Sequence, residues 1–382
     1  MKATAAVLRS FAQPLALEKV EVKPLAPGQV LVEVEAAGVC GSDVHMWRGK
    51  DPRTPLPIIL GHEGVGRVVE VNGDRLNIHG QRLQVGDRIL WERSVTCGQC
   101  YYCAVLHEPA LCSQRWAYGI HRSLEVPPHL NGCYASHLVL DPRTPLAPLG
   151  NDEDPALFVS ASCSGATAAH GFELSPARVG DTVIILGPGP LGAFSVSLAQ
   201  AGGAEQIMVI GGTGMRLDLC QRLGATLTLN RQETSIGERL ERVRDLTHGR
   251  GADLVVEASG SVAAAEEGLG LLRHGGTLSL VGFGTPVGTM ALAPFEALVR
   301  KNVRIQGVWV SDARHTFQAT SLIRQNRSAF AELVTHRFPL TQATQALEAV
   351  ANREAMKAVL LPTLLATTNM ERQSWQNMSG KG

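Results

Sequence analysis

Residues 39–45, VCGSDVH, place four chemically active side chains within seven positions. Cys40 near His45 could be a nucleophile with its base. Ser42, Asp43 and His45 could form a hydrogen-bonded proton relay. Cys40 could equally be one ligand of a metal ion whose other ligands lie far along the chain. The heptapeptide alone leaves all three hypotheses open.

A second group of cysteines lies in CGQCYYCAVLHEPALC, residues 97–112. Four thiolates at such spacing can surround one tetrahedral ion, as structural zinc sites require, and leave no position open for a substrate. An iron–sulfur motif is the rival, but it needs its fourth cysteine after three residues and a proline behind it. Here the gap is eight residues and Ser113 follows. We therefore expect a structural zinc held by Cys97, Cys100, Cys103 and Cys112.

A glycine-rich turn follows an apolar run in DTVIILGPGPLGAFSVSLAQ, residues 181–200. In a GxGxxG pattern that joins a strand to a helix, the first glycine allows a tight turn and the second lets a pyrophosphate approach the backbone. The third allows the helix to pack closely on the strand, and the helix N-terminus faces the phosphates. The pattern predicts a dinucleotide site that includes Gly187, Gly189, Pro190, Leu191 and Gly192.

The next expected strand ends in IMVIGGTGMR, where dinucleotide sites usually carry an acidic residue for the adenosine ribose. Gly211 and Gly212 stand in its place, so no carboxylate would repel a 2′-phosphate. Thr213 and Arg216 are close enough along the chain to contact such a phosphate, although Arg216 could also be an ordinary solvated residue of the next helix. The sequence thus leaves the cofactor as NAD or NADP.

The elements that must position these residues change in character along the chain. Up to about residue 150 the sequence has short β-type runs separated by Gly and Pro, which is typical of an all-β unit. From about residue 180, apolar strands alternate with helical stretches, which predicts a parallel sheet covered on both faces. A further strand is expected at 303–310, with helices near 312–325 and 341–350. The fold class is therefore α/β, with a β domain and a doubly wound domain.

The bulk composition excludes several classes of function. Lys plus Arg and Asp plus Glu both number 35, so no basic field would attract nucleic acid or anionic lipid. We expect no membrane partner, because no apolar run approaches the roughly 20 residues of a membrane span. The N-terminus is interrupted by Lys2, Arg9 and Pro14 before a signal sequence could form. A cytoplasmic enzyme with a small-molecule substrate is the expectation.

Four motifs in order, GVCGSDVH, GHEGVGRV, the four-cysteine segment and GPGPLG, resemble the zinc-dependent medium-chain alcohol and polyol dehydrogenases. The resemblance extends from residue 1 to about 362. It implies a GroES-like β domain with a catalytic zinc, followed by a Rossmann domain. The boundaries expected from it are 1–165 with a structural-zinc lobe at 92–115, 166–305, a return to the first domain at 306–362, and a tail at 363–382.

The resemblance also assigns roles to single residues. It implies that Cys40, His62 and Cys163 bind the catalytic zinc, with Glu63 either a carboxylate beside the site or an alternate ligand. Asp43 would orient the ring of His62, and Ser42 and His45 would carry the substrate proton away. One further residue is implied near the cofactor pyrophosphate and Glu63, namely Lys357, which could also be an ordinary solvated lysine.

The function implied is hydride transfer between an alcohol, secondary or polyol-type, and NAD(P)⁺, in a protein with two zinc ions per chain. Relatives assemble through their last Rossmann strands, so a homodimer or homotetramer is expected. The alternatives are a non-catalytic protein or a cofactor-retaining dismutase on the same scaffold. Trp47, Trp91 and Trp116 could line the substrate cleft or belong to the core. The tail could dock through Trp375.

Overall fold

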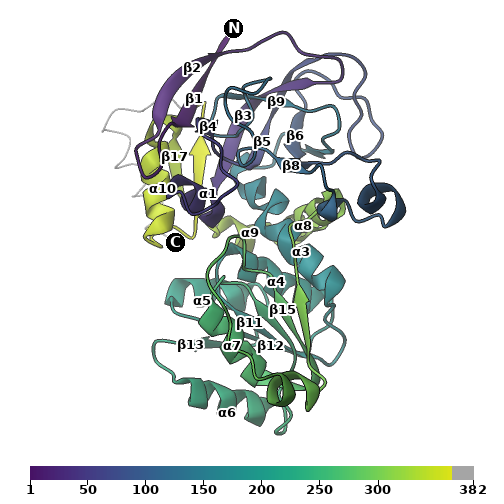
Figure 1. Ribbon diagram of the computed structural model, residues 1–382, viewed down its shortest axis with the longest axis vertical. Helices are drawn as coiled ribbons and strands as arrows, with labels where there is room; N and C mark the ends of the chain where they lie inside the picture. Colours follow the sequence, from purple (N-terminus) through teal and green to yellow (C-terminus); the bar gives the residue numbers. More distant parts are fainter. Residues whose placement is uncertain (364–382) are drawn as a thin grey trace.

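The computed structural model describes residues 1–363 and arranges them in two lobes (Figure 1). The upper lobe contains the N-terminal strands, drawn in purple and blue, together with the yellow C-terminal segment. The lower lobe contains the teal and green middle of the chain. Helices α3 (Ser164–Leu174) and α8 (Ala313–Gln325) lie between the two lobes, where they contact each other.

A seven-stranded sheet forms the centre of the upper lobe, in the order β10-β6-β5-β3-β18-β17, with β9 also paired to β3. Strand β18 runs antiparallel to β3, with Ala358 opposite Val39. The end of the described chain therefore returns to the sheet that the N-terminal half builds. The strands are β3 (Val30–Val39), β5 (Glu63–Val71), β6 (Arg88–Trp91), β9 (His137–Leu140), β10 (Leu146–Leu149), β17 (Val334–Pro339) and β18 (Lys357–Leu361).

Smaller elements complete this lobe. A three-stranded sheet, a two-stranded ribbon and several short helices surround the main sheet. They are β1 (Lys2–Leu8), β2 (Ala16–Glu21), β4 (Ile58–Ile59), β7 (Ser94–Val95), β8 (Trp116–Ala117), α1 (Gly41–Trp47), η1 (Tyr101–Val105), η2 (Pro109–Leu111), α2 (Pro155–Phe158), η3 (Val159–Ser162), α9 (Arg327–Ala331), η5 (Leu340–Gln342) and α10 (Ala343–Ala351). Trp91 and Trp116 belong to the buried core, and Trp47 packs against it. The core alternative for these tryptophans is therefore the one that the structure supports.

The lower lobe is built on a six-stranded sheet in the order β13-β12-β11-β14-β15-β16, and every neighbouring pair is parallel. All five residues of β11 are buried, as its apolar sequence predicts. The strands are β11 (Thr182–Leu186), β12 (Gln206–Gly211), β13 (Leu227–Asn230), β14 (Ala252–Glu257), β15 (Leu272–Leu280) and β16 (Arg304–Gly307). The remaining helices are α4 (Pro190–Ala201), α5 (Gly214–Arg222), α6 (Ile236–Leu246), α7 (Val262–Leu271) and η4 (Phe295–Val299).

The α/β fold class, with a mainly β lobe and a lobe built on a parallel sheet, is thus confirmed. The strand expected at 303–310 is shorter and covers only Arg304–Gly307. No helix in the described part of the chain is long and apolar enough to cross a membrane. The suggested docking of the tail through Trp375 lies outside the described residues.

Candidate metal and cofactor site

Two groups of metal-ligating side chains form within residues 1–363. One contains Cys40, His62, Glu63 and Cys163, and the other contains Cys97, Cys100, Cys103 and Cys112. In each group the candidate ligand atoms all lie within 4.8 Å of one another. The structure therefore brings together the three distant residues that the family resemblance assigned to a catalytic zinc, with Glu63 beside them.

Asp43 positions two members of the first group at once. Its Oδ2 accepts a hydrogen bond of 2.8 Å from the backbone N–H of Cys40, at the start of helix α1. Its Oδ1 lies 3.2 Å from Nδ1 of His62, and both side chains are buried. A carboxylate beside Nδ1 fixes the orientation of the ring and leaves Nε2 to face a metal ion. Nε2 of His62 indeed points to the cluster, 3.3 Å from Sγ of Cys163.

The distances fit a zinc ion. Zinc–sulfur and zinc–nitrogen bonds of about 2.3 and 2.05 Å in a tetrahedron place two sulfurs about 3.8 Å apart and a sulfur and a nitrogen about 3.6 Å apart. Sγ of Cys40 and Sγ of Cys163 are 3.9 Å apart, and Nε2 of His62 is 3.3 Å from the second sulfur. In the four-cysteine group, Sγ of Cys97 and Sγ of Cys112 are 3.6 Å apart. Both donor sets suit zinc.

Sγ of Cys40 and Sγ of Cys163 in the first group lie 3.9 Å apart, within hydrogen-bond distance of each other. A hydrogen bond from Cys163 lowers the pKa of Cys40. The same hydrogen bond, together with burial, raises the pKa of Cys163. A divalent cation can replace a shared proton between two thiols, because metal binding releases protons from its ligands. In the other group, a hydrogen bond from the backbone N–H of Cys103 lowers the pKa of Cys100 to about 6, which also favours a thiolate ligand.

Glu63 forms a buried ion pair behind the cluster. Its Oε2 lies 2.5 Å from Nζ of Lys357, and both side chains are at most 2% exposed. Burial raises the pKa of Glu63 and the Lys357 ammonium opposes that rise. Burial lowers the pKa of Lys357, but Glu63 outweighs it, so the ammonium form persists. Lys357 is thus not the ordinary solvated lysine of the alternative hypothesis.

Gly38 makes room for this carboxylate. It stands opposite Glu63 in the pairing of β3 with β5. A side-chain carbon on Gly38 would meet Oε2 of Glu63 at 2.0 Å, which is far inside van der Waals contact. Any larger residue at position 38 would push the Glu63 carboxylate out of its place beside Lys357.

Ser42 and His45 both lie on α1 and are half-buried. Residues three apart on a helix are neighbours on one face. The hydroxyl of Ser42 lies 3.9 Å from Sγ of Cys40. It also lies 3.6 Å from the position that a side-chain carbon on Gly284 would occupy, so it faces a loop of the other lobe. The relay proposed for these two residues remains a prediction.

A cavity of about 880 Å³ extends from Cys40 of the metal cluster to the glycine-rich turn. Gly187 has φ = +114° at the tight turn, and a carbon on Gly192 would strike the Gly187 carbonyl at 1.9 Å. These are the reasons for glycine that the motif predicts. The cavity is lined by Cys40, Gly187, Gly189, Pro190, Leu191, Gly211, Gly212, Thr213, Arg216, Arg231, Gln232 and Lys357, among others.

Arg216 and Arg231 differ in how their charges are used. Nη2 of Arg216 donates to the backbone carbonyl of Ala355 at 2.9 Å, so part of this guanidinium serves to hold the chain before β18. Arg231 is exposed, and its Nε would lie 3.2 Å from a side-chain carbon on Gly212. Arg231 was missed in the sequence. It could have been found, because the carboxyl ends of the adjacent parallel strands β12 and β13 must meet at one edge of the sheet.

Arg93 is a second functional residue that no sequence motif indicated. It follows β6 and is 6% exposed. Its Nη1 donates to Sγ of Cys163 at 2.7 Å, and its Nη2 donates to Thr167 and Ser311. Burial lowers its pKa, but the Cys163 thiolate and then Glu92 outweigh that effect, and the pKa is raised. Nothing near Arg93 in the sequence points to Cys163, so only the fold reveals the contact.

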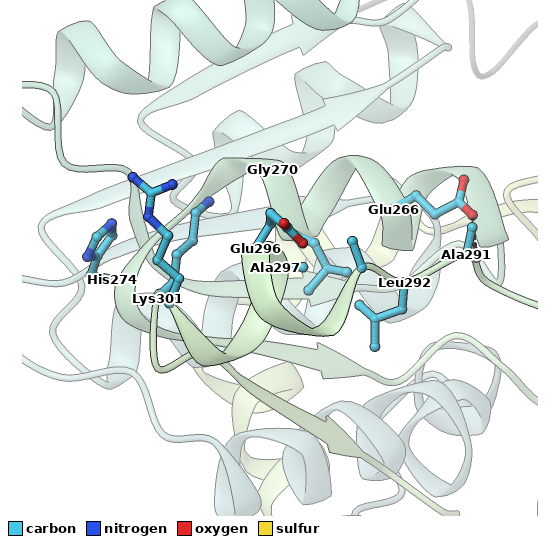
Figure 2. A pocket seen from close by; sticks show the side chains of 11 residues that line it. Glu266, Gly270, His274, Ala291, Leu292, Glu296, Ala297 and Lys301 are labelled. Atoms are coloured by element: carbon cyan, nitrogen blue, oxygen red, sulfur yellow. Dashed lines mark hydrogen bonds between the residues drawn. The ribbon is translucent and has the colours of Figure 1, made fainter.

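A separate surface groove lies on the lower lobe, between α7 and η4 (Figure 2). Glu266, Glu296, His274 and Lys301 are among the residues that line it. It shares no residue with either cysteine-containing cluster. We therefore assign the chemistry to the cavity beside Cys40 and not to this groove.

Two family models match the chain in the places that the geometry indicates. The model described as an alcohol dehydrogenase GroES-like domain matches residues 26–151. The model described as a zinc-binding dehydrogenase matches residues 190–325.

Individual proteins resemble the chain over most of its length. A 5-exo-hydroxycamphor dehydrogenase from Pseudomonas putida is 34% identical over 343 residues, which cover 89% of this chain and 93% of that enzyme. A sorbitol dehydrogenase from Halalkalibacterium halodurans is 31% identical over 350 residues, covering 90% and 94% of the two chains. The crystal structure of an alcohol dehydrogenase from Thermotoga maritima has 49% identity and a TM-score of 0.91, covering 94% and 99%. A zinc-binding dehydrogenase structure from Sinorhizobium meliloti bound to NADP has 26% identity and a TM-score of 0.82, covering 95% and 100%.

Proposed function

Because the chain belongs to the zinc-dependent medium-chain dehydrogenase/reductase family, whose members are oxidoreductases acting on CH–OH groups, we propose that it transfers hydride between a secondary or polyol-type alcohol and NAD(P)⁺. One observation carries the proposal. Cys40 of the metal cluster and the glycines of the nucleotide turn line the same cavity. A substrate oxygen near the cluster and a nicotinamide ring in the cleft can therefore meet.

Each side chain then has a defined task. A zinc ion held by Cys40, His62 and Cys163 would act as a Lewis acid and lower the pKa of the alcohol. Asp43 holds the His62 ring and the Cys40 backbone in fixed positions relative to each other. Ser42, whose hydroxyl lies beside the Cys40 sulfur, accepts the alcohol proton, and His45 on the same helix face passes it to water.

The substrate class rests on the relatives. They include a 5-exo-hydroxycamphor dehydrogenase, a sorbitol dehydrogenase and an L-threonine 3-dehydrogenase. Hydroxycamphor, sorbitol and L-threonine each carry a hydroxyl group on a secondary carbon. A secondary alcohol is therefore the substrate class that agrees with all three names.

We further propose that the cofactor site accepts NADP⁺ at least as well as NAD⁺. Gly211 and Gly212 replace the carboxylate that would repel a 2′-phosphate, and the guanidinium of Arg231 lies beside Gly212. Replacing Arg231 with Ala should raise the KM for NADP⁺ about tenfold or more, since a charge-assisted contact is lost, and leave the KM for NAD⁺ nearly unchanged. Steady-state kinetics with both cofactors measure this, and an equal change in both constants would contradict it.

The activity itself is tested with a panel of primary alcohols, secondary alcohols and polyols, each supplied with NAD⁺ and with NADP⁺. Formation of reduced cofactor with a secondary alcohol is the expected result. His62→Ala should lose at least about a thousandfold in kcat/KM, while His137→Ala, on β9 and outside both clusters, should retain activity.

The two alternatives give different results. A non-catalytic protein would give no reduced cofactor with any alcohol. A cofactor-retaining dismutase would interconvert an added alcohol and aldehyde without net reduction of free cofactor. Equal rates of alcohol oxidation in the wild type and in His62→Ala would contradict the zinc-dependent mechanism.

A further inference from the structure

The guanidinium of Arg93 is buried against a residue that the proposed function assigns to the metal. Its Nη1 lies 2.7 Å from Sγ of Cys163, which is short for a hydrogen bond to sulfur. Its other partners in the described chain are the hydroxyls of Thr167, at 2.9 Å, and Ser311, at 3.2 Å. No carboxylate is among these partners. A buried cation is costly unless an anion compensates it, and Cys163 would supply that anion once metal binding removes its proton.

The contact is held from three separate elements. Arg93 lies between β6 and β7, Thr167 is on α3, and Ser311 precedes α8. Thr167 lies one helical turn beyond Cys163 and its backbone N–H donates to the Cys163 carbonyl. The two hydroxyls therefore fix the plane of the guanidinium relative to the sulfur.

The remaining donors of Arg93 do not suit an anionic substrate. A guanidinium binds a carboxylate or phosphate through two parallel N–H groups, and both such pairs include Nη2. The two hydrogens of Nη2 are already donated to Thr167 and Ser311. Nε is buried without a partner, but alone it offers a single donor. The geometry thus favours a role toward the sulfur over a role toward a charged substrate.

We propose that Arg93 is a positioning residue of the metal site, whose hydrogen bond withdraws electron density from the Cys163 thiolate and so makes the bound metal a stronger Lewis acid. A proton donor to a metal-bound thiolate reduces the charge that the sulfur gives to the metal. The proposal rests on the metal cluster of the proposed function. It adds a residue outside the ligand set that governs how strongly the metal activates an alcohol.

The test uses ¹¹³Cd NMR of the full chain with zinc exchanged for cadmium. The wild type should give two signals, and the one absent from Cys163→Ala belongs to the Cys40–His62–Cys163 cluster. In Arg93→Met this signal should move to higher frequency, since the sulfur becomes a stronger donor, while the four-cysteine signal stays in place. In Arg93→Lys, which retains the charge and one donor, the shift should be smaller.

Arg115→Met is the matched control. Arg115 is half-buried nearby, and its guanidinium donates to Ser94 and to no ligand of either cluster. Its backbone N–H donates to the Cys112 carbonyl, a hydrogen bond that methionine at this position would keep. Both cadmium signals should stay in place in this variant. On the zinc enzymes, Arg93→Met should lower kcat about 10- to 100-fold with little change in KM for the alcohol.

Each outcome bears on one claim. A single cadmium signal in the wild type would overturn the metal site and with it the proposed function. If the wild type gives two signals but the Cys40–His62–Cys163 signal does not move in Arg93→Met, this inference alone is overturned. The same holds if Arg93→Met raises the KM for the alcohol without moving that cadmium signal. If Arg93→Met fails to fold, Thr167→Val loosens the guanidinium without removing its charge, and an unmoved cluster signal there would contradict the inference equally.

Discussion

At the scale of single residues, the site depends on side chains that serve two partners. Asp43 caps the start of α1 with one oxygen and orients His62 with the other. Lys357 neutralises Glu63, and its Nζ also lies 3.4 Å from the backbone carbonyl of Val39, next to Cys40. Because each group is shared, a small displacement of one residue changes the geometry of several ligands.

Gly38 gives a direct test of this crowding. Gly38→Ala should displace the Glu63 carboxylate and lower the free energy of unfolding by about 1–3 kcal/mol, the usual cost of overpacking a core. Gly41→Ala is the control, because nothing lies within 4 Å of a side-chain carbon there. Urea unfolding of both variants measures the difference. Equal stabilities of Gly38→Ala and the wild type would show that Glu63 is not confined as described.

At the scale of elements, motifs that lie within one short stretch could be predicted from their spacing, whereas contacts between distant segments could not. The glycine-rich turn and the four-cysteine segment each lie within one short stretch, so their spacing alone predicted them. Cys40, His62 and Cys163 directly precede α1, β5 and α3, and only the family resemblance connected them. Arg93 has no such motif, since its contact with Cys163 exists only after the sheet and α3 have packed.

The buried carboxylate of Glu153, in the loop between β10 and α2, is shared by two arginines, one from α8 and one from α9. Glu153 accepts hydrogen bonds from Arg324 at 2.8 Å and from Arg327 at 2.9 Å. The hydrogen bond from Arg324 lowers the pKa of Glu153, although burial opposes this. A carboxyl with a lowered folded-state pKa stabilises the protein above its unfolded pKa of about 4.3, and this stability is lost as the pH falls toward the folded value.

Glu153→Gln should therefore cost at least about 1 kcal/mol of unfolding free energy at pH 7. The gap between the variant and the wild type should narrow as the pH is lowered from about 5, because the wild-type carboxyl becomes protonated. Urea unfolding of both proteins at matched pH values isolates this group from others that titrate in the same range. A gap that stays constant down to about pH 3 would contradict the assignment.

At the scale of the whole molecule, no strand within residues 1–363 pairs with the outer edge of β16 in the six-stranded sheet of the lower lobe. Strand β16 is the last strand of its sheet, and Phe295 and Val299 of the neighbouring η4 are 62% and 64% exposed. An unpaired edge next to exposed apolar side chains favours pairing with another chain. We propose that a second copy of this chain covers this edge.

Light scattering tests the assembly. The wild type should have a mass of two or four times 40.8 kDa, and the double variant Phe295→Glu with Val299→Glu should fall toward 40.8 kDa. Val179→Glu, at a position 89% exposed before β11, controls for added charge and should leave the mass unchanged. A monomeric wild type would exclude the proposed interface.

The central claim is a second, chemically active zinc site made by residues that are far apart in the sequence. Elemental analysis of the purified protein measures it directly. The account predicts two zinc ions per chain in the wild type and in Cys220→Ala, whose thiol is buried in α5 outside both clusters, and one in Cys163→Ala. Two zinc ions in Cys163→Ala, or a single zinc ion in the wild type, would contradict it.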